Sequence, residues 1–276
     1  MKKIGLALGA GGARGLAHIV ILEALEELKI KPSVIAGSSI GAIIGAFYAA
    51  GFTTKQMHKI LDEIIYGTKS RFWEIHKKSD FIKYFELLDP TIKTGGLLRG
   101  EKLISFLGDK IKVSVFNDLE IPFKVIATDY HKKSQVVLDK GDLLTAIRAS
   151  YALPFLFPPV RRDGVLLIDG GMVNPLPFDV LRDQCDITIA IDVSATKDGK
   201  NKSEIPPSYE ILFSAFQIMQ SSIVNGKLLA DQPDVHIKTN IRGVRVHDFI
   251  KLDVIYKEAK PCKEELKMKL SKLLEI

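Results

Sequence analysis

The beginning of the chain contains the same local pattern twice: a short apolar run, a turn of small residues, and a segment with helically spaced apolar residues. The first expected strand covers residues 3–8, with its apolar run at 4–8, and precedes the turn 9–12. The second covers 34–36 and precedes the turn 37–41. Short apolar runs bounded by turns are typical of strands buried on both faces of a sheet. Strands separated by a helix pair in parallel through a right-handed crossover. This pattern therefore predicts a parallel sheet covered by helices.

The rest of the chain continues the alternation of helices and strands. We expect helices over 15–28, 40–50, 53–66, 100–111, 143–150, 175–183 and 209–229, strands over 122–128, 135–138, 165–168, 187–193 and 235–238, and a Lys/Glu-rich amphipathic helix at the C-terminus. The predicted fold class is α/β, with a central, mostly parallel sheet sandwiched between helices. We expect one main domain over 4–193 and a helical extension over 194–276 that packs on it.

Residues 67–99 show neither the apolar spacing of a helix nor the alternation of a strand. They combine aromatic with basic side chains, and the aromatic residues include Phe72 and Trp73. Aromatic residues among lysines suit the headgroup region of a membrane. This segment is interpreted either as a lid with an interfacial surface or as an ordinary helical insertion packed on the sheet.

Composition limits where the protein works and what it binds. The 276 residues are 46% hydrophobic and 26% charged, which is typical of a folded globular protein. Cys185 and Cys262 lie far apart and outside any metal-ligand spacing, so we expect a reduced, intracellular chain and not a disulfide scaffold. The apolar run 4–8 is too short for a signal peptide, and no later run matches a membrane span. We expect a cytoplasmic protein whose net charge of +6 either favours peripheral contact with an anionic lipid surface or is simply ordinary for its compartment.

The turn at 37–41 has the pattern Gly-x-Ser-x-Gly, with Ser39 at its centre between Gly37 and Gly41. Such a turn between a strand and a helix exposes the serine hydroxyl, and the helix N-terminus favours developing negative charge. Ser39 is therefore the candidate nucleophile of an acyl hydrolase. The alternative is a glycine-flanked structural turn.

The glycine-rich turn after the first strand could bind an anion through its backbone amides. A dinucleotide fold would have a third glycine where Arg14 stands and an acidic residue where Ser38 and Ser39 stand, and a phosphate loop would contain Gly-Lys-Ser/Thr. Both nucleotide interpretations are thereby weakened. The favoured interpretation is an oxyanion hole formed by the amides of Gly11, Gly12 and Ala13. Arg14 either holds this loop, or an anionic head group, or is a solvated residue at the helix start.

A serine nucleophile needs a base within hydrogen-bond reach. None of the six histidines follows a strand in a glycine-rich setting, whereas Asp169-Gly170-Gly171 comes directly after the apolar strand 165–168. Three motifs that each follow a strand can meet at one edge of the sheet. A carboxylate has a low reference pKa, so burial would have to raise it for Asp169 to serve as the base.

These motifs together resemble the patatin-like phospholipases, which are distantly similar to the cytosolic group IV phospholipases. The matching segments are 11–15, 37–41, 169–171, 174–177, 149–154 and 157–160. The resemblance implies a Ser39–Asp169 dyad without a catalytic histidine, a metal or a cofactor, and a lipid or acyl-ester substrate rather than a nucleic acid. Ala10 and Ala13 replace glycines that are common in the family, but their amides can still donate.

Three functional hypotheses follow. The first is an esterase or phospholipase that uses Ser39, Asp169 and the glycine loop. The second is an α/β-hydrolase with a Ser39–Asp169–histidine triad, in which His236 or His247 comes in the right chain order. The third is a non-catalytic protein that binds lipid in the same pocket. Head group, acyl length, sn-position and oligomeric state stay open.

Overall fold

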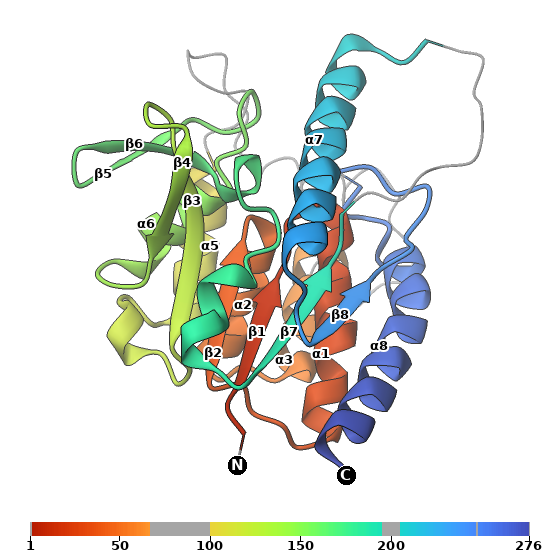
Figure 1. Ribbon diagram of the computed structural model, residues 1–276. Coiled ribbons are helices and arrows are strands. Elements are labelled where there is room, and N and C mark those ends of the chain that lie inside the picture. The colour runs from red at the N-terminus through yellow and green to blue at the C-terminus, as the bar shows by residue number, and fades with distance from the viewer. Residues whose placement is uncertain (1, 67–99, 195–204, 247, 276) are drawn as a thin grey trace, which may run out of the picture.

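Eight strands form one sheet in the part of the chain that the computed structural model describes, namely residues 2–66, 100–194, 205–246 and 248–275 (Figure 1). Five of them run parallel in the order β3-β2-β1-β7-β8. Their bounds are β1 Ile4–Leu8, β2 Val34–Ser38, β3 Phe123–Asp129, β7 Ile187–Asp192 and β8 Val235–Lys238. Three antiparallel strands complete the sheet: β4 Ser134–Leu138, β5 Val160–Arg162 and β6 Val165–Asp169. The predicted fold class, a mostly parallel sheet flanked by helices, is confirmed.

The two faces of the sheet differ in side-chain size. In β1, Leu6 and Leu8 point into the larger core, while Ala7 belongs to the smaller core on the opposite face. Side chains alternate between faces along a strand, so this sequence alternation assigns each face its own packing partners.

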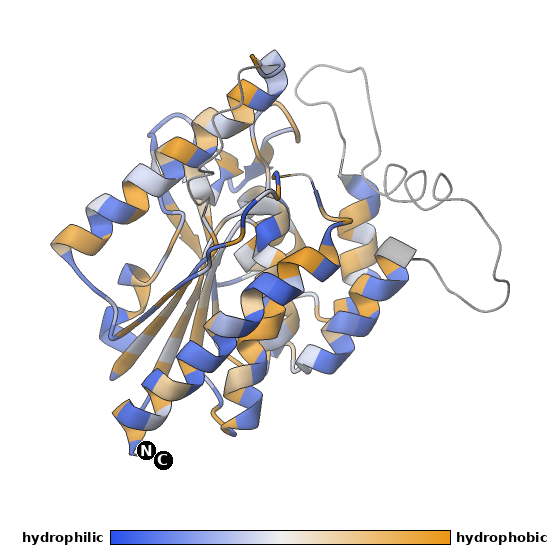
Figure 2. Cartoon of the chain, turned by 90° about the vertical axis from the view of Figure 1, so that its right-hand side faces the viewer, coloured by the Kyte–Doolittle hydropathy of each residue, from blue (hydrophilic) through white to orange (hydrophobic). Residues whose placement is uncertain are grey.

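Most helices cover the face with the large side chains. They are α1 Ala17–Glu27, α2 Ile40–Ala49, α3 Thr54–Tyr66, α5 Glu101–Ile111, α6 Leu143–Ser150 and α8 Leu252–Leu274. The Lys/Glu-rich α8 packs along α1, and hydrophobic and hydrophilic residues alternate along it in Figure 2. Leu266 and Leu270 on this helix are fully buried, whereas Val254 and Met268 are exposed, so one side of the helix is docked on the domain.

The opposite face is covered by the short 3-10 helix η4 (Asp179–Gln184) and by α7 (Ser208–Ala230). Phe178 and Val224 pack there against the small residues of the central strands. The C-terminal half of α7 is therefore held on the sheet, whereas its N-terminal half extends beyond the strands in Figure 1.

The junction at β3 positions the site. Residues 123–126 of β3 pair with β2, and residues 127–129 pair with β6 in the antiparallel sense. Because β4 pairs with Val125–Asp129, it occupies the other edge of β3, so β2 and β6 share one edge. Their C-terminal ends therefore face each other along β3.

Several local predictions need correction. The helix expected over 15–28 begins as a 3-10 turn, η1 (Gly12–Leu16), before α1. The helix expected over 175–183 is instead the 3-10 helix η4, because Pro175 and Pro177 lack amide donors. The three-residue strand β5 was not predicted from the sequence. The lid interpretation of 67–99 lies outside the described residues.

Candidate active site

Ser39 occupies the sharp turn between β2 and α2. Its backbone has φ 54° and ψ −120°, a conformation that costs energy for any residue with a side chain. The amide of Ser39 donates a hydrogen bond of 2.9 Å to Ser150 Oγ, at the end of α6. The strain and this bond together hold the hydroxyl away from the strand direction and toward a cavity.

Gly37 and Gly41 are required by close packing around this turn. A Cβ at Gly37 would lie 2.4 Å from the carbonyl oxygen of Gly41, and a Cβ at Gly41 would lie 2.1 Å from the carbonyl oxygen of Leu8. Both contacts involve backbone atoms, which cannot move aside cheaply. The spacing of glycines around Ser39 therefore has a steric cause.

Asp169, the last residue of β6, accepts a hydrogen bond from the Ser39 hydroxyl. Ser39 Oγ donates to Asp169 Oδ2 at 2.8 Å, and the amide of Gly171 donates to Asp169 Oδ1 at 2.7 Å. The backbone of Asp169 is fixed as well, since its amide donates to the Ala152 carbonyl at 3.0 Å and its carbonyl accepts from Thr128 Oγ1 at 2.8 Å. The carboxylate is therefore held in one orientation.

Burial changes the acidity of Asp169. Only 1% of the residue is exposed, and this desolvation raises its pKa to about 7, although the bonds from Ser39 and Gly171 oppose the shift. A carboxylate with a pKa near neutrality is a far better proton acceptor than a solvated one. The burial that was expected to raise the pKa of this carboxyl is thus present.

The glycine loop places two amides at the cavity. Gly11 and Gly12 line the cavity beside Ser39, and among the described residues neither amide has a hydrogen-bond acceptor. The amide of Ala13 instead donates to the carbonyl of Val246 at 2.8 Å. Of the three amides expected from the sequence, those of Gly11 and Gly12 therefore make no hydrogen bond with the described residues.

Arg14 is buried beneath this loop, with 3% of the residue exposed. Its Nε donates to the Val193 carbonyl at 3.3 Å and its Nη1 to the Val244 carbonyl at 3.0 Å. The interpretation of Arg14 as a solvated residue is therefore wrong, and the structure favours the role of holding the loop.

His18 also supports the glycine loop, a role that the sequence did not indicate. The fully buried ring donates from Nε2 to the Gly9 carbonyl at 2.9 Å, because a carbonyl can only accept. Desolvation lowers the pKa of His18 to about 4, so the ring is neutral at neutral pH. Its helical position beside Ile19 gave no sign of this polar contact.

No histidine of the described residues lines the cavity. His236 lies on β8 with its Nε2 3.7 Å from Asp192 Oδ2, and His58 bonds to Glu23. His247 and His76 lie outside the described residues.

The cavity beside Ser39 and Asp169 has a volume of about 210 Å³ and is mainly apolar. Its walls come from α2, α3, α5, the segment 151–157 and α7, and include Ile43, Ile44, Phe47, Met57, Ile60, Leu61, Ile64, Leu103, Phe106, Leu107, Leu156, Phe157, Phe213 and Phe216. Among its described lining residues, side-chain oxygen or nitrogen atoms are carried only by Ser39, Asp169, Tyr151, Gln217 and Gln220. The two glutamines, on α7, were missed by the sequence analysis because an isolated glutamine in a helix carries no motif.

The described residues lack two further features. No group of three or more metal-ligating side chains is present in them. Likewise, none of their helices is long and apolar enough to cross a membrane.

The fold and the site define an α/β protein with a serine on a strand-to-helix turn, bonded to a buried carboxylate. The family described as patatin-like phospholipase matches residues 6–182, and the chain belongs to this family. The resemblance inferred from the motifs is thereby confirmed.

Relatives of two kinds share this region. An uncharacterised NTE family protein of Mycobacterium tuberculosis is 37% identical over 205 residues, which cover 74% of this chain and 52% of the relative. The Drosophila melanogaster protein named neuropathy target esterase sws is 33% identical over 200 residues, covering 71% of this chain and 13% of that protein. The chain thus spans about half of the mycobacterial relative and a small part of the animal one.

A solved structure supports the fold. ExoU of Pseudomonas aeruginosa, in complex with SpcU, superposes with a TM-score of 0.51 at 14% identity, covering 100% of this chain and 53% of that one. At this identity the likeness concerns the fold alone.

Proposed function

We propose that this protein is a serine acyl hydrolase that cleaves fatty-acyl esters of lipids, with Ser39 as nucleophile and Asp169 as proton acceptor. The observation that carries the proposal is the 2.8 Å hydrogen bond between Ser39 Oγ and a buried carboxylate whose pKa is raised to about 7, at the wall of an apolar cavity. Membership of the patatin-like phospholipase family and the esterase named among the relatives support it.

Acylation begins when Ser39 Oγ attacks the ester carbonyl while Asp169 accepts the hydroxyl proton. The carbonyl oxygen becomes negatively charged and is stabilised by the amides of Gly11 and Gly12, which line the cavity next to Ser39. Asp169 then returns the proton to the departing alkoxide. An alcohol leaves, and the acyl group remains on Ser39.

Deacylation repeats these roles with water. Asp169 accepts a proton from a water molecule that attacks the acyl-enzyme, and the same amides stabilise the second oxyanion. When this intermediate collapses, the bond between the acyl carbon and Ser39 Oγ breaks, Asp169 returns its proton to Ser39 Oγ, and the fatty acid is released. These two proposed reaction steps require neither a metal nor a cofactor.

The apolar walls suit the acyl chain. α2, α3 and α5 together contribute apolar lining residues such as Ile44, Met57 and Phe106. Each methylene removed from water contributes roughly 0.8 kcal/mol, so a cavity of this kind favours fatty-acyl over acetyl esters. We also infer a cytoplasmic location with peripheral contact to lipid surfaces, from which such substrates would come.

The nucleophile is tested by labelling with a fluorophosphonate probe, which phosphonylates activated serines. Wild type and the Ser38→Ala control should be labelled, because the neighbouring Ser38 hydroxyl is buried, whereas Ser39→Ala should not. Labelling of Ser39→Ala at the wild-type rate would remove the assignment. The absence of turnover on every acyl ester, despite lipid binding, would instead favour the non-catalytic hypothesis.

The histidine triad is tested separately. His236→Gln and His247→Gln should each keep kcat within about threefold of wild type, since the proposed base is a carboxylate that needs no histidine. A loss of a hundredfold or more in either variant would replace the dyad by a triad.

A further inference from the structure

The helix α7 lies outside the residues matched by the family, yet it forms one wall of the cavity. Phe213 and Phe216 contribute apolar surface, and Gln217 and Gln220 contribute carboxamides. Only 8% of Gln220 is exposed, and its side chain makes no hydrogen bond with the described residues. Because Gln220 lies in the cavity wall and its carboxamide is not bonded to another described side chain, the carboxamide is free to bind a ligand in the cavity.

Gln220 lies beside the proposed base. A Cβ added to Gly171 would lie 2.4 Å from Gln220 Nε2 and 3.0 Å from Asp169 Oδ1. The carboxamide and the carboxylate therefore flank the same α-carbon. A side chain at position 171 would have to displace the end of the Gln220 side chain.

The position of Gln220 is fixed by contacts at the C-terminal end of α7. Lys227, two turns further along, donates to Asn174 Oδ1 at 2.7 Å and to the Leu176 carbonyl at 2.8 Å, and it also pairs with Asp179. These acceptors belong to the segment that directly follows Asp169-Gly170-Gly171. Lys227 thus ties α7 to the segment that carries the proposed base.

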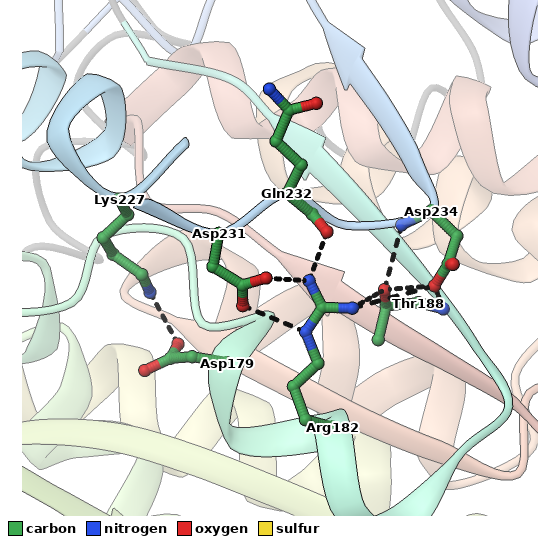
Figure 3. Close-up of polar contacts among 7 residues, drawn as sticks. All are labelled: Asp179, Arg182, Thr188, Lys227, Asp231, Gln232 and Asp234. Carbon is green, nitrogen blue, oxygen red and sulfur yellow. Dashed lines mark hydrogen bonds and ion pairs between the residues drawn. The ribbon is translucent and has the colours of Figure 1, made fainter. Parts of the chain in front are cut away.

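A second group of polar contacts holds the residues after α7 (Figure 3). Arg182 on η4 binds Asp231 through two bonds of 2.7 and 3.0 Å and also donates to the Gln232 carbonyl. Asp234 accepts from both the amide and the hydroxyl of Thr188 at 2.7 Å. The end of α7 is therefore fastened to η4 and β7, and Gln220 is held against the site.

We propose that the carboxamide of Gln220 binds an oxygen of the leaving alcohol and selects esters of polyols, such as glyceryl esters, over esters of simple alcohols. This inference rests on the proposed function. Asp169 returns its proton to the alkoxide, so the alcohol must leave next to Asp169, where Gln220 lies. A hydroxyl next to the scissile ester can both donate to and accept from a carboxamide, whereas an ethyl group leaves it unsatisfied.

The test compares two esters with the same acyl chain, 1-decanoylglycerol and ethyl decanoate. We expect wild type to prefer the glyceryl ester in kcat/KM and Gln220→Met to lose about tenfold on it, because one hydrogen bond in a buried site is removed. Turnover of ethyl decanoate should stay within twofold. The control Asn225→Leu, an amide removed from the exposed face of α7, should keep the wild-type preference.

An equal loss on both esters, or no loss on either, overturns the assignment of Gln220. Folding is checked by thermal unfolding, in which Gln220→Met should melt close to the wild-type temperature because no described hydrogen bond of the protein is lost. A second measurement needs no turnover: 1-O-decylglycerol should raise the melting temperature of Ser39→Ala more than decanol does, and Gln220→Met should abolish that difference. If wild type cleaves neither ester, the proposed function fails, and the assignment of Gln220 fails with it.

Discussion

Ser39 Oγ lies 2.8 Å from Asp169 Oδ2 because β2 and β6 end against each other along one edge of β3. Ser38, the last residue of β2, pairs with Ile126, and Asp169, the last residue of β6, pairs with the next residue, Ala127. Adjacent residues of one strand thus set the spacing of the proposed nucleophile and base. Five predictions follow from this geometry and its surroundings.

Asp169→Asn should lower kcat by about 10²- to 10⁴-fold, since an amide cannot accept the serine proton and general base catalysis contributes that range. Steady-state kinetics on a decanoyl ester would measure it. Asp129→Asn is the matched control, because Asp129 also ends a strand but accepts only from the turn amides of His131 and Lys132. Equal activity of Asp169→Asn and wild type would contradict the base assignment.

The pH dependence should report the raised pKa of Asp169. The base must be ionised, so kcat/KM should be low at pH 5, rise with an apparent pKa of about 7 and level off above pH 8. A pH–rate profile on a neutral ester checks this. A plateau that already begins at pH 5 would show an ordinary carboxylate.

Ionisation of the buried Asp169 carboxyl should lower the free energy of unfolding. Its folded pKa of about 7 exceeds the unfolded value, so the native state loses stability as pH rises from about 4 to 7, by at most about 4 kcal/mol. Asp169→Asn avoids this loss and should be more stable than wild type at pH 8, with a smaller difference at pH 5. Urea unfolding at both pH values measures it, and a less stable variant at pH 8 would refute the sign.

The titration of His18 should lower the free energy of unfolding as the pH falls, which is opposite to the effect of Asp169. Its folded pKa of about 4 lies below the unfolded value near 6.5, so stability is lost as pH falls between these values, by at most about 3 kcal/mol. His18→Gln keeps a donor for the Gly9 carbonyl but cannot titrate. The wild type should therefore lose stability relative to His18→Gln between pH 7 and pH 5 in chemical unfolding, and a constant difference would argue against a neutral buried ring.

Two glycine substitutions should have opposite effects on folding. Gly41→Ala should destabilise the protein by about 2 kcal/mol or more, because the new methyl would lie 2.1 Å from the Leu8 carbonyl oxygen. Gly226→Ala on α7 meets no atom within 4 Å and should stabilise it by up to about 1 kcal/mol through helix propensity. Urea unfolding of both variants, with unchanged slopes, would test the pair. Similar stabilities would show that the turn relaxes around Gly41.

The sequence was sufficient for elements that depend on local chemistry. The alternation of apolar runs and turns predicted β1, β2 and the helices that follow them, and the glycine pattern marked Ser39 as the centre of a tight turn. The residue types of the glycine loop predicted free amides, but the sequence could not tell which of them would be used. The carbonyl of Val246, far along the chain, accepts a hydrogen bond from the amide of Ala13. The amides of Gly11 and Gly12 make no such bond with the described residues.

The sequence indicated that the strand before Asp169 could end near Ser39, but it did not give the direction of that strand. In the structure β6 is antiparallel to β3 and approaches β2 from the opposite end of the same edge. Side-chain periodicity identifies a strand and its buried face, but it does not say which edge of which neighbour the strand joins.

By itself, the sequence determined the family, the strand-to-helix turn at Ser39 and the identity of the carboxylate at the end of β6, because each depends on residues close together in the chain. Only the tertiary structure decided that Asp169 is buried and bonded to Ser39, that Arg14 and His18 hold the glycine loop, and that Gln220 faces the base. These features depend on contacts between distant segments, and it is the exclusion of water at those contacts that shifts the pKa of Asp169 and leaves the Gln220 carboxamide available for a substrate.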